Sequence, residues 1–221
     1  MKVTGLEIDD DQVVARDGGF LAIRRVHLRN RRDDGSLSPQ YLCDFAVRPY
    51  GLDAVVVVIW RRAGGHIEVL VRDALRPPLS LGRPADRQTI PDVRTYLHLT
   101  ELVAGILESS DHGLEGLRHR AAEEVHEEAG YTVEPASVVT LGAASFPSPG
   151  SLAEKFHFVA VELAPDAPHS PPAGDGSPME EGALTRWLDL DRALEMCVSG
   201  EIEDLKTEVG LRRFADHLRE E

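Results

Sequence analysis

Short runs of apolar residues with the spacing of β-strands recur along most of the chain. Residues 41–50 read YLCDFAVRPY, where apolar side chains alternate with Asp44 and Arg48 and predict a strand with two different faces. Residues 54–60, AVVVVIW, are apolar throughout, which is typical of a strand covered on both sides. The strands expected from these patterns cover residues 20–30, 41–50, 54–60, 67–72, 137–143, 155–163 and 184–190.

Turn residues between the runs indicate how the first strands connect. An Asp-Gly pair within RRDDGSLSP predicts a hairpin between residues 20–30 and 41–50, and RRAGGH predicts a second hairpin between residues 54–60 and 67–72. Helices are expected over residues 113–129, 191–199 and 203–219, and Gly130 stands where a helix C-terminus favours glycine. Mostly antiparallel strands with helices packed outside predict an α+β fold or an α/β/α sandwich.

The segment 77–99 is rich in proline and arginine and shows little periodicity. We therefore expect a long loop over the surface of the domain. Ordered loops of this length are commonly lids or binding elements.

Composition and charge limit the class of protein. The 221 residues, 42% of them apolar, are enough for a sizeable core. A net charge of -14 argues against binding nucleic acid or an anionic membrane through net charge. The first residues lack the apolar stretch of a secretory signal, and the apolar run at 54–60 is too short to span a bilayer. Cys43 and Cys197 lack metal-ligand spacing and are expected to be inert thiols, so we expect a soluble, cytoplasmic protein.

Four glutamates fall within six residues of AAEEVHEEAGY, residues 121–131. On a helical wheel, Glu124 and Glu128 lie at the edge of the apolar stripe, and Glu127 can contribute to the same site. Carboxylates four residues apart beside a buried stripe are costly to ionise together unless a cation lies between them. Their hard oxygen atoms favour Mg²⁺ or Mn²⁺. The predicted apolar stripe consists of Leu114, Leu117, Ala121 and Val125.

The alternative is that these glutamates form a solvated acidic helix end without a ligand. The helix dipole disfavours acidic side chains near a C-terminus, which weakens this interpretation.

The acidic stretch resembles the signature of the Nudix hydrolases: Gly, five residues, Glu, seven residues, Arg-Glu, an aliphatic, any residue, Glu-Glu, any residue, Gly, an aliphatic. Two positions depart from the pattern. Nine residues rather than five separate Gly105 from Glu115, and Glu123 occupies the position of the arginine, which in the family holds the catalytic glutamates and balances their charge. Arg120, three residues before Glu123, is a candidate substitute. The residues that match are Glu115, Glu124, Val125, Glu127, Glu128, Gly130 and Tyr131.

The resemblance extends beyond this motif and covers most of residues 45–215. ELVAG (101–105), FPSPGSLAEKFHFVAVEL (146–163) and GEIEDLKTEVGL (200–211) are similar to segments of ADP-ribose pyrophosphatases and related nucleotide-sugar pyrophosphatases. The resemblance implies an α+β Nudix fold, an α/β/α sandwich of mixed, mostly antiparallel strands. It also implies an N-terminal β-hairpin extension over 1–50 used in dimerisation, and a hydrolase domain over 51–221 with an insertion at 77–99.

The resemblance further implies roles for individual residues. Glu124 and Glu128 would be the principal ligands of Mg²⁺ or Mn²⁺, with Glu127 as a ligand or water-positioning group and the backbone carbonyl of Ala104 as a further ligand. The candidates for the general base are Glu180 and Glu181, and then Glu154. The residues implied to meet the substrate are Arg48, Arg76 and Glu101.

Arginines make the insertion locally basic within an acidic protein. We hypothesise that residues 77–99 form a lid whose guanidinium groups bind a diphosphate. The loop arginines are Arg83, Arg87 and Arg94.

The expected reaction is hydrolysis of the diphosphate of ADP-ribose or a related nucleoside diphosphate sugar by a homodimer that binds neither nucleic acid nor membranes. Two alternatives remain open at this stage. The substrate is another nucleotide sugar, such as GDP-mannose or UDP-glucose, or the protein is a non-catalytic sensor that binds a nucleotide sugar.

Overall fold

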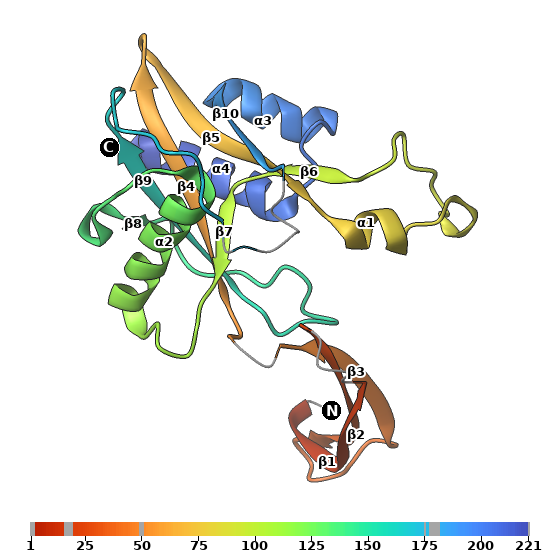
Figure 1. Cartoon of the computed structure of the whole chain (residues 1–221). Coiled ribbons are helices and arrows are strands. Elements are labelled where there is room, and N and C mark those ends of the chain that lie inside the picture. The colour runs from red at the N-terminus through yellow and green to blue at the C-terminus, as the bar shows by residue number, and fades with distance from the viewer. Residues whose placement is uncertain (1–2, 16–19, 49–50, 175, 177–181, 221) are drawn as a thin grey trace. The chain divides into compact units, whose positions relative to one another are not determined.

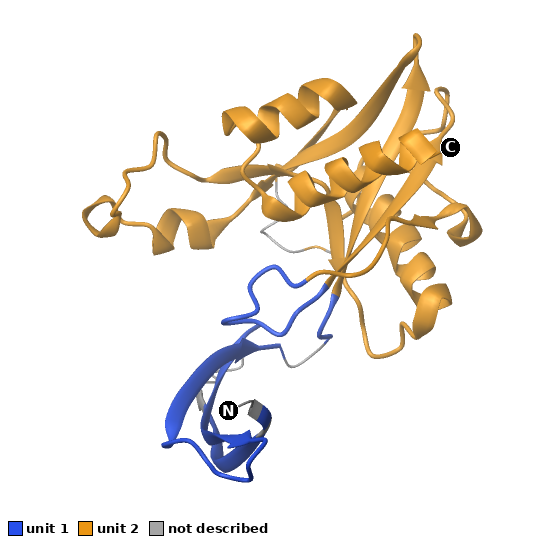
Figure 2. Ribbon diagram, turned by 180° about the vertical axis from the view of Figure 1, so that it is seen from behind, with its two compact units in different colours: residues 1–53, 146–155 blue, residues 54–145, 156–221 orange. Residues whose placement is uncertain are grey.

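A computed structural model describes residues 3–15, 20–48, 51–174, 176 and 182–220. The chain divides into two compact units, which Figure 2 distinguishes by colour. The first unit comprises residues 1–53 and 146–155, and the second comprises residues 54–145 and 156–221. The first unit therefore includes a segment from the middle of the chain.

The first unit contains an antiparallel sheet with the strand order β1-β2-β3 (Figure 1). The predicted hairpin is present, but β1 was not predicted because three consecutive aspartates interrupt its apolar alternation. Arginines of β2 pair with two of these acids across the sheet: Arg29 with Asp9 at 3.1 Å, and Arg24 with Asp11. Opposite charges on facing strands stabilise such a pairing. The strands are β1 (Val3–Ala15), β2 (Ala22–Arg32) and β3 (Tyr41–Val47).

The second unit is built on a larger sheet with the order β10-β5-β4-β9-β8, in which β6 also pairs with β5 and β7 with β4. Strands β4 and β9 run parallel, and the other pairs are antiparallel. This is the mixed, mostly antiparallel sheet that was predicted. Its strands are β4 (Ala54–Ala63), β5 (His66–Leu75), β6 (His98–Glu101), β7 (Val103–Ile106), β8 (Val139–Thr140), β9 (Phe156–Leu163) and β10 (Leu184–Asp189).

Helices cover both faces of this sheet. Helix α2 (Gly113–Ala129) lies on one face, and α3 (Leu190–Ser199) and α4 (Leu205–Glu220) lie on the other (Figure 1). Each face of the sheet carries a hydrophobic core, and strand β4 contributes to both because its successive side chains point to opposite faces. Val57 packs in the core under α2, and Val58 packs in the core under α4. The second unit is therefore an α/β/α sandwich, as predicted.

The insertion at 77–99 contains more regular structure than the long loop that was predicted. Helix α1 (Pro77–Gly82) and a 3₁₀ turn (Ala85–Arg87) precede β6. Proline pre-sets the backbone angle of a first helical turn, so the Pro77-Pro78 pair begins this helix. The absence of periodicity concealed it because the helix covers only six residues.

Candidate functional site

Helix α2 carries the acidic cluster and begins and ends where the sequence predicted. It ends at Gly130, whose left-handed backbone (φ 72°) suits glycine at a helix C-terminus. Leu114 was placed on the buried stripe but is 49% exposed, and it is the second residue of the helix, which begins at Gly113. The buried residues of α2 are Leu117, Ala121, Glu124, Val125 and Ala129.

Glu124 thus lies within the buried row rather than at its edge. Its carboxylate packs against the backbone of Gly105 in β7. A β-carbon placed on Gly105 would lie 1.7 Å from Oε1 and 1.8 Å from Cδ of Glu124. Only glycine at position 105 leaves room for this carboxylate, which explains why a glycine follows Ala104 in this strand.

Glu128 lies one turn after Glu124, and its carboxylate has one hydrogen bond and one ion pair, each on a different oxygen. The backbone N–H of Ala104 donates to Oε2 at 3.1 Å, and the guanidinium of Arg72 pairs with Oε1. The Ala104 and Gly105 backbone in β7 therefore contacts both carboxylates. The N–H of Ala104 contacts Glu128, while the role of its carbonyl as a metal ligand stays a prediction.

Arg72 is the residue of this site that the sequence did not reveal. It lies in β5, is 3% exposed, and reaches Glu128 from 56 positions away in the chain. The surrounding sequence, IEVLVRDAL, reads as an ordinary strand with one charged position. A buried arginine requires an anionic partner, but periodicity does not identify that partner.

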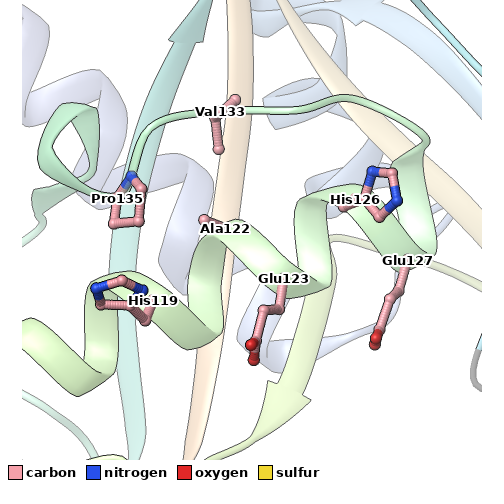
Figure 3. Close-up of a pocket in the computed structure, with 7 residues that line it drawn as sticks. All are labelled: His119, Ala122, Glu123, His126, Glu127, Val133 and Pro135. Atoms are coloured by element: carbon pink, nitrogen blue, oxygen red, sulfur yellow. The ribbon is translucent and has the colours of Figure 1, made fainter.

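Glu127 points to a different part of the helix surface. It lines a pocket of about 280 Å³ on the outer side of α2, together with other side chains of the helix and of the following segment (Figure 3). In Figure 3 the carboxylates of Glu123 and Glu127 extend from the same side of the helix, one turn apart. The pocket is lined by His119, Ala122, Glu123, His126, Glu127, Val133 and Pro135.

The site has the donor chemistry of a divalent cation, although its side chains form only part of a coordination shell. Within the described residues, no group of three or more His, Cys, Asp and Glu side chains is arranged to hold a metal ion. Mg²⁺, however, keeps several waters and is commonly held by one or two carboxylates together with substrate phosphates. Glu124 and Glu128 beside the Ala104–Gly105 backbone fit that mode of binding.

Glu101 was expected beside the substrate, but it is buried between two cations at the end of β6. Its carboxylate accepts from Lys206 Nζ at 2.7 Å and from Arg76 Nε at 3.2 Å, and only 2% of it is exposed. Burial alone would raise the pKa of Glu101, but Lys206 and Arg76 outweigh it and hold the pKa below its ordinary value of 4.5. The carboxylate therefore stays ionised and anchors Arg76, whose side chain is 36% exposed.

The junction between β6 and β7 is tied to the start of α4. Besides the pair between Lys206 and Glu101, the N–H of Leu102 donates to the hydroxyl of Thr207 at 2.8 Å, and Asp204 accepts from Lys206 at 2.9 Å. These bonds hold the residues that lead directly into Ala104 and Gly105. The sequence did not identify Lys206 and Thr207 as part of this junction, because they lie about a hundred residues away from their partners.

The arginines of the insertion form ion pairs of their own. Arg83 pairs with Asp92 at 2.6 Å, and Arg94 pairs with Glu203 at 2.5 Å. Arg87 lies exposed in the 3₁₀ turn. Arg94 therefore anchors the returning end of the insertion, and Arg87 is exposed to solvent.

Two predicted site residues belong to the first unit. Arg48 pairs with Glu154 and donates to the carbonyl of Leu52 at 2.9 Å. The side chains of Arg48 and Glu154 are mostly buried, with exposed fractions of 11% and 16%.

Glu180 and Glu181, the first candidates for the general base, lie outside the described residues.

Comparisons with known proteins agree with the architecture. No family model and no curated protein matches the sequence. Among solved structures, the chain is similar to an ADP compounds hydrolase, with a TM-score of 0.69 and 15% identity over 99% of this chain and 97% of that chain.

Two further solved structures align less well. A C. elegans Ap4A hydrolase has a TM-score of 0.42 and 16% identity, covering 77% of this chain and 99% of that one. The NUDIX domain of Shewanella oneidensis NrtR, solved in complex with ADP ribose, has a TM-score of 0.47 and 13% identity, covering 76% of this chain and 88% of that one. The similarity to the ADP compounds hydrolase extends over nearly the whole of both chains, so the chain has the Nudix fold, as predicted.

Proposed function

We propose that this protein is a metal-dependent hydrolase that cleaves the diphosphate of ADP-ribose or a related nucleoside diphosphate sugar. The products would be a nucleoside monophosphate and a sugar phosphate. The observation that carries the proposal is the meeting of two carboxylates, Glu124 and Glu128, at the backbone of Ala104 and Gly105. Two acids held beside one short strand are costly unless a cation joins them.

Glu124 and Glu128 would hold the cation together with phosphate oxygens of the substrate. Mg²⁺ or Mn²⁺ bound there would stabilise the negative charge that develops on the leaving phosphate. Glu127 is only partly buried and faces a pocket, so we assign it to positioning the attacking water. The oxygen of this water bonds to one phosphorus, and the bond from that phosphorus to the bridging oxygen breaks.

A base must take the proton of that water. We keep Glu180 and Glu181 as the first candidates and Glu154 as the next. Because Glu154 is already paired with Arg48, it would have to leave that partner to act as the base.

The cationic side chains supply contacts for the diphosphate. Arg76 combines an exposed guanidinium with a fixed anchor at Glu101, which makes it our first candidate for a phosphate contact. Glu101 is too buried to meet the substrate, so we revise its role to holding Arg76 and Lys206. Arg48, Arg87 and Arg94 remain proposed contacts.

A second candidate function is a sensor that binds the nucleotide sugar without hydrolysing it. It is favoured by Glu123 at the arginine position of the motif and by the pairing of Glu128 with Arg72. In that case Arg72, rather than a metal ion, would neutralise Glu128.

The test is mononucleotide release from ADP-ribose, GDP-mannose and UDP-glucose with Mg²⁺ or Mn²⁺. Glu128→Gln should lower kcat at least about 100-fold, because the substitution removes a ligand charge at the reaction centre. Glu195→Gln, at an exposed glutamate of α3, is the control and should retain activity. Retained nucleotide binding with no turnover of any substrate would favour the sensor.

A further inference from the structure

Helix α2 lacks a cation of its own beside Glu128. Glu123 stands where the motif has arginine, and it is an exposed acid. Arg120, the candidate substitute, is engaged by Asp111 at 2.9 Å and by Glu123 at 3.2 Å. Arg118 donates to the carbonyl of Val138 at 3.0 Å. Arg118 and Arg120 thus bind the segments that flank the helix.

The cation at Glu128 comes instead from the sheet. Arg72 is a buried residue of β5, and its guanidinium pairs with Glu128 Oε1. The N–H of Ala104 in β7 holds the other oxygen at 3.1 Å. The Ala104 N–H in β7 and the Arg72 charge in β5 therefore hold the two oxygens of one carboxylate on the helix, and each oxygen keeps a second lone pair for a further ligand.

The pairing of Arg72 with Glu128 offsets repulsion between two neighbouring acids. Glu124 and Glu128 are adjacent acids on one helix face, and like charges at this spacing repel. A guanidinium beside Glu128 balances the charge of that carboxylate before any ligand arrives. Because arginine is planar and always protonated, it orients a carboxylate as well as balancing its charge, which a lysine does less well.

We propose that Arg72 is a positioning residue for Glu128, and that it takes the place of the arginine missing from position 123. This inference rests on the proposed function. Groups that orient a metal ligand through a hydrogen bond commonly change metal affinity or activity 10- to 100-fold when removed. We expect Arg72→Met to have an effect of about that size on both properties.

The first experiment measures Mn²⁺ binding by calorimetry, which does not depend on turnover. Arg72→Met should weaken Mn²⁺ binding by about 10-fold or more, and Arg72→Lys should recover part of the loss. Arg61→Met is the matched control, since Arg61 is a strand arginine paired with Glu68 on β5, and it should leave Mn²⁺ affinity unchanged. Unchanged or tighter Mn²⁺ binding by Arg72→Met would overturn the inference.

The second experiment compares the kinetics of the single and double variants of Arg72 and Glu128. Arg72→Met should lower kcat more than it raises KM, and Arg72→Met with Glu128→Gln should be no slower than Glu128→Gln alone, because the role we propose for the arginine requires the carboxylate of Glu128. Additive losses would show that Arg72 acts elsewhere. If Arg72→Met does not fold, Arg72→Lys and the double variant, which removes both charges together, carry the same comparisons.

The two proposals fail in different ways. If the wild type binds Mn²⁺ but hydrolyses no nucleotide sugar, the hydrolase proposal fails while the calorimetry still tests Arg72. If the wild type hydrolyses its substrate and Arg72→Met keeps both kcat and Mn²⁺ affinity, only the inference about Arg72 fails.

Discussion

The carboxylate of Glu124 occupies the space in which a side chain on Gly105 would begin. A β-carbon at position 105 would lie 1.7 Å from Glu124 Oε1, far inside van der Waals contact. The helix and the strand therefore constrain each other: the glycine admits the acid, and a larger residue at position 105 would have to displace this carboxylate.

Gly105→Ala is expected to displace the Glu124 carboxylate without unfolding the protein. The overlap falls on the flexible end of the glutamate side chain, so the carboxylate turns away while the strand remains paired. A shift of about 1 Å in a reacting group can cost roughly 100-fold in rate, and we expect kcat/KM to fall by 10- to 100-fold. Enzyme kinetics and urea unfolding measure the two effects. Gly82→Ala, where a β-carbon meets nothing within 4 Å, is the control, and equal kinetics for both variants would contradict this account.

The buried ion pairs of Glu101 make a pH-dependent contribution to stability. Its pKa in the folded protein lies below the ordinary value of 4.5, so the contribution is present above pH 4.5 and is lost as the pH falls through the lower folded value. Glu101→Gln should lower the free energy of unfolding at pH 7 by about 3 kcal/mol, because it leaves Lys206 and Arg76 without this charge.

Urea unfolding from pH 3 to pH 7 tests this directly. The difference in free energy of unfolding between Glu101→Gln and the wild type should decrease as the pH falls toward 3. Glu68→Gln, which breaks the half-exposed pair with Arg61, should cost less than about 1 kcal/mol. A difference in free energy of unfolding that stays constant with pH would show that Glu101 stabilises the protein through packing rather than charge.

The insertion is expected to contribute to substrate binding rather than to the chemical step. Arg87→Ala combined with Arg94→Ala should raise KM for a nucleoside diphosphate sugar by about 10-fold, through loss of charge-assisted contacts and of the anchor at Glu203. Steady-state kinetics test this, with Arg219→Ala at the end of α4 as the control. Unchanged KM and kcat in the double variant would remove the lid hypothesis.

The N-terminal sheet remains the predicted dimer contact. Large apolar side chains are exposed on its strands, and exposed apolar surface can mark an interface. We expect sedimentation to show a dimer at micromolar concentration that Ile8→Lys with Leu42→Lys dissociates. Val198→Lys, at an exposed apolar position of α3, should leave the dimer intact. The exposed residues of the N-terminal sheet include Leu6, Ile8, Val13, Ile23, Tyr41 and Leu42.

Cys197 should behave as an unreactive thiol, as its sequence context predicted. Burial, with a smaller contribution from Glu208, raises the pKa of Cys197 from 9.0 to about 11. Only the thiolate is nucleophilic, so alkylation by iodoacetamide at pH 8 should be about 100-fold slower in the folded protein than in urea. Mass spectrometry of the labelled peptides measures both rates. Equal rates would contradict burial of this thiol.

No helix in the part of the chain that the structure describes is long and apolar enough to cross a membrane.

The sequence by itself determined the local elements of this protein. The run at 54–60, the acids of residues 121–131 and the glycine after them depend on periodicity and backbone preference over a few residues. The central hairpin, α2 and the two C-terminal helices therefore lie where they were expected.

Tertiary structure decided which cations meet Glu128 of α2 and Glu101 of β6. Arg72 reaches Glu128, and Lys206 reaches Glu101 across 105 positions, because β5, the β6–β7 junction and α4 are packed against one another in the folded sheet. Strand β1 also needed its partner, since cross-strand arginines balance the aspartates that concealed its pattern. Charge pairing between distant segments leaves no period in the sequence, so only the folded chain reveals it.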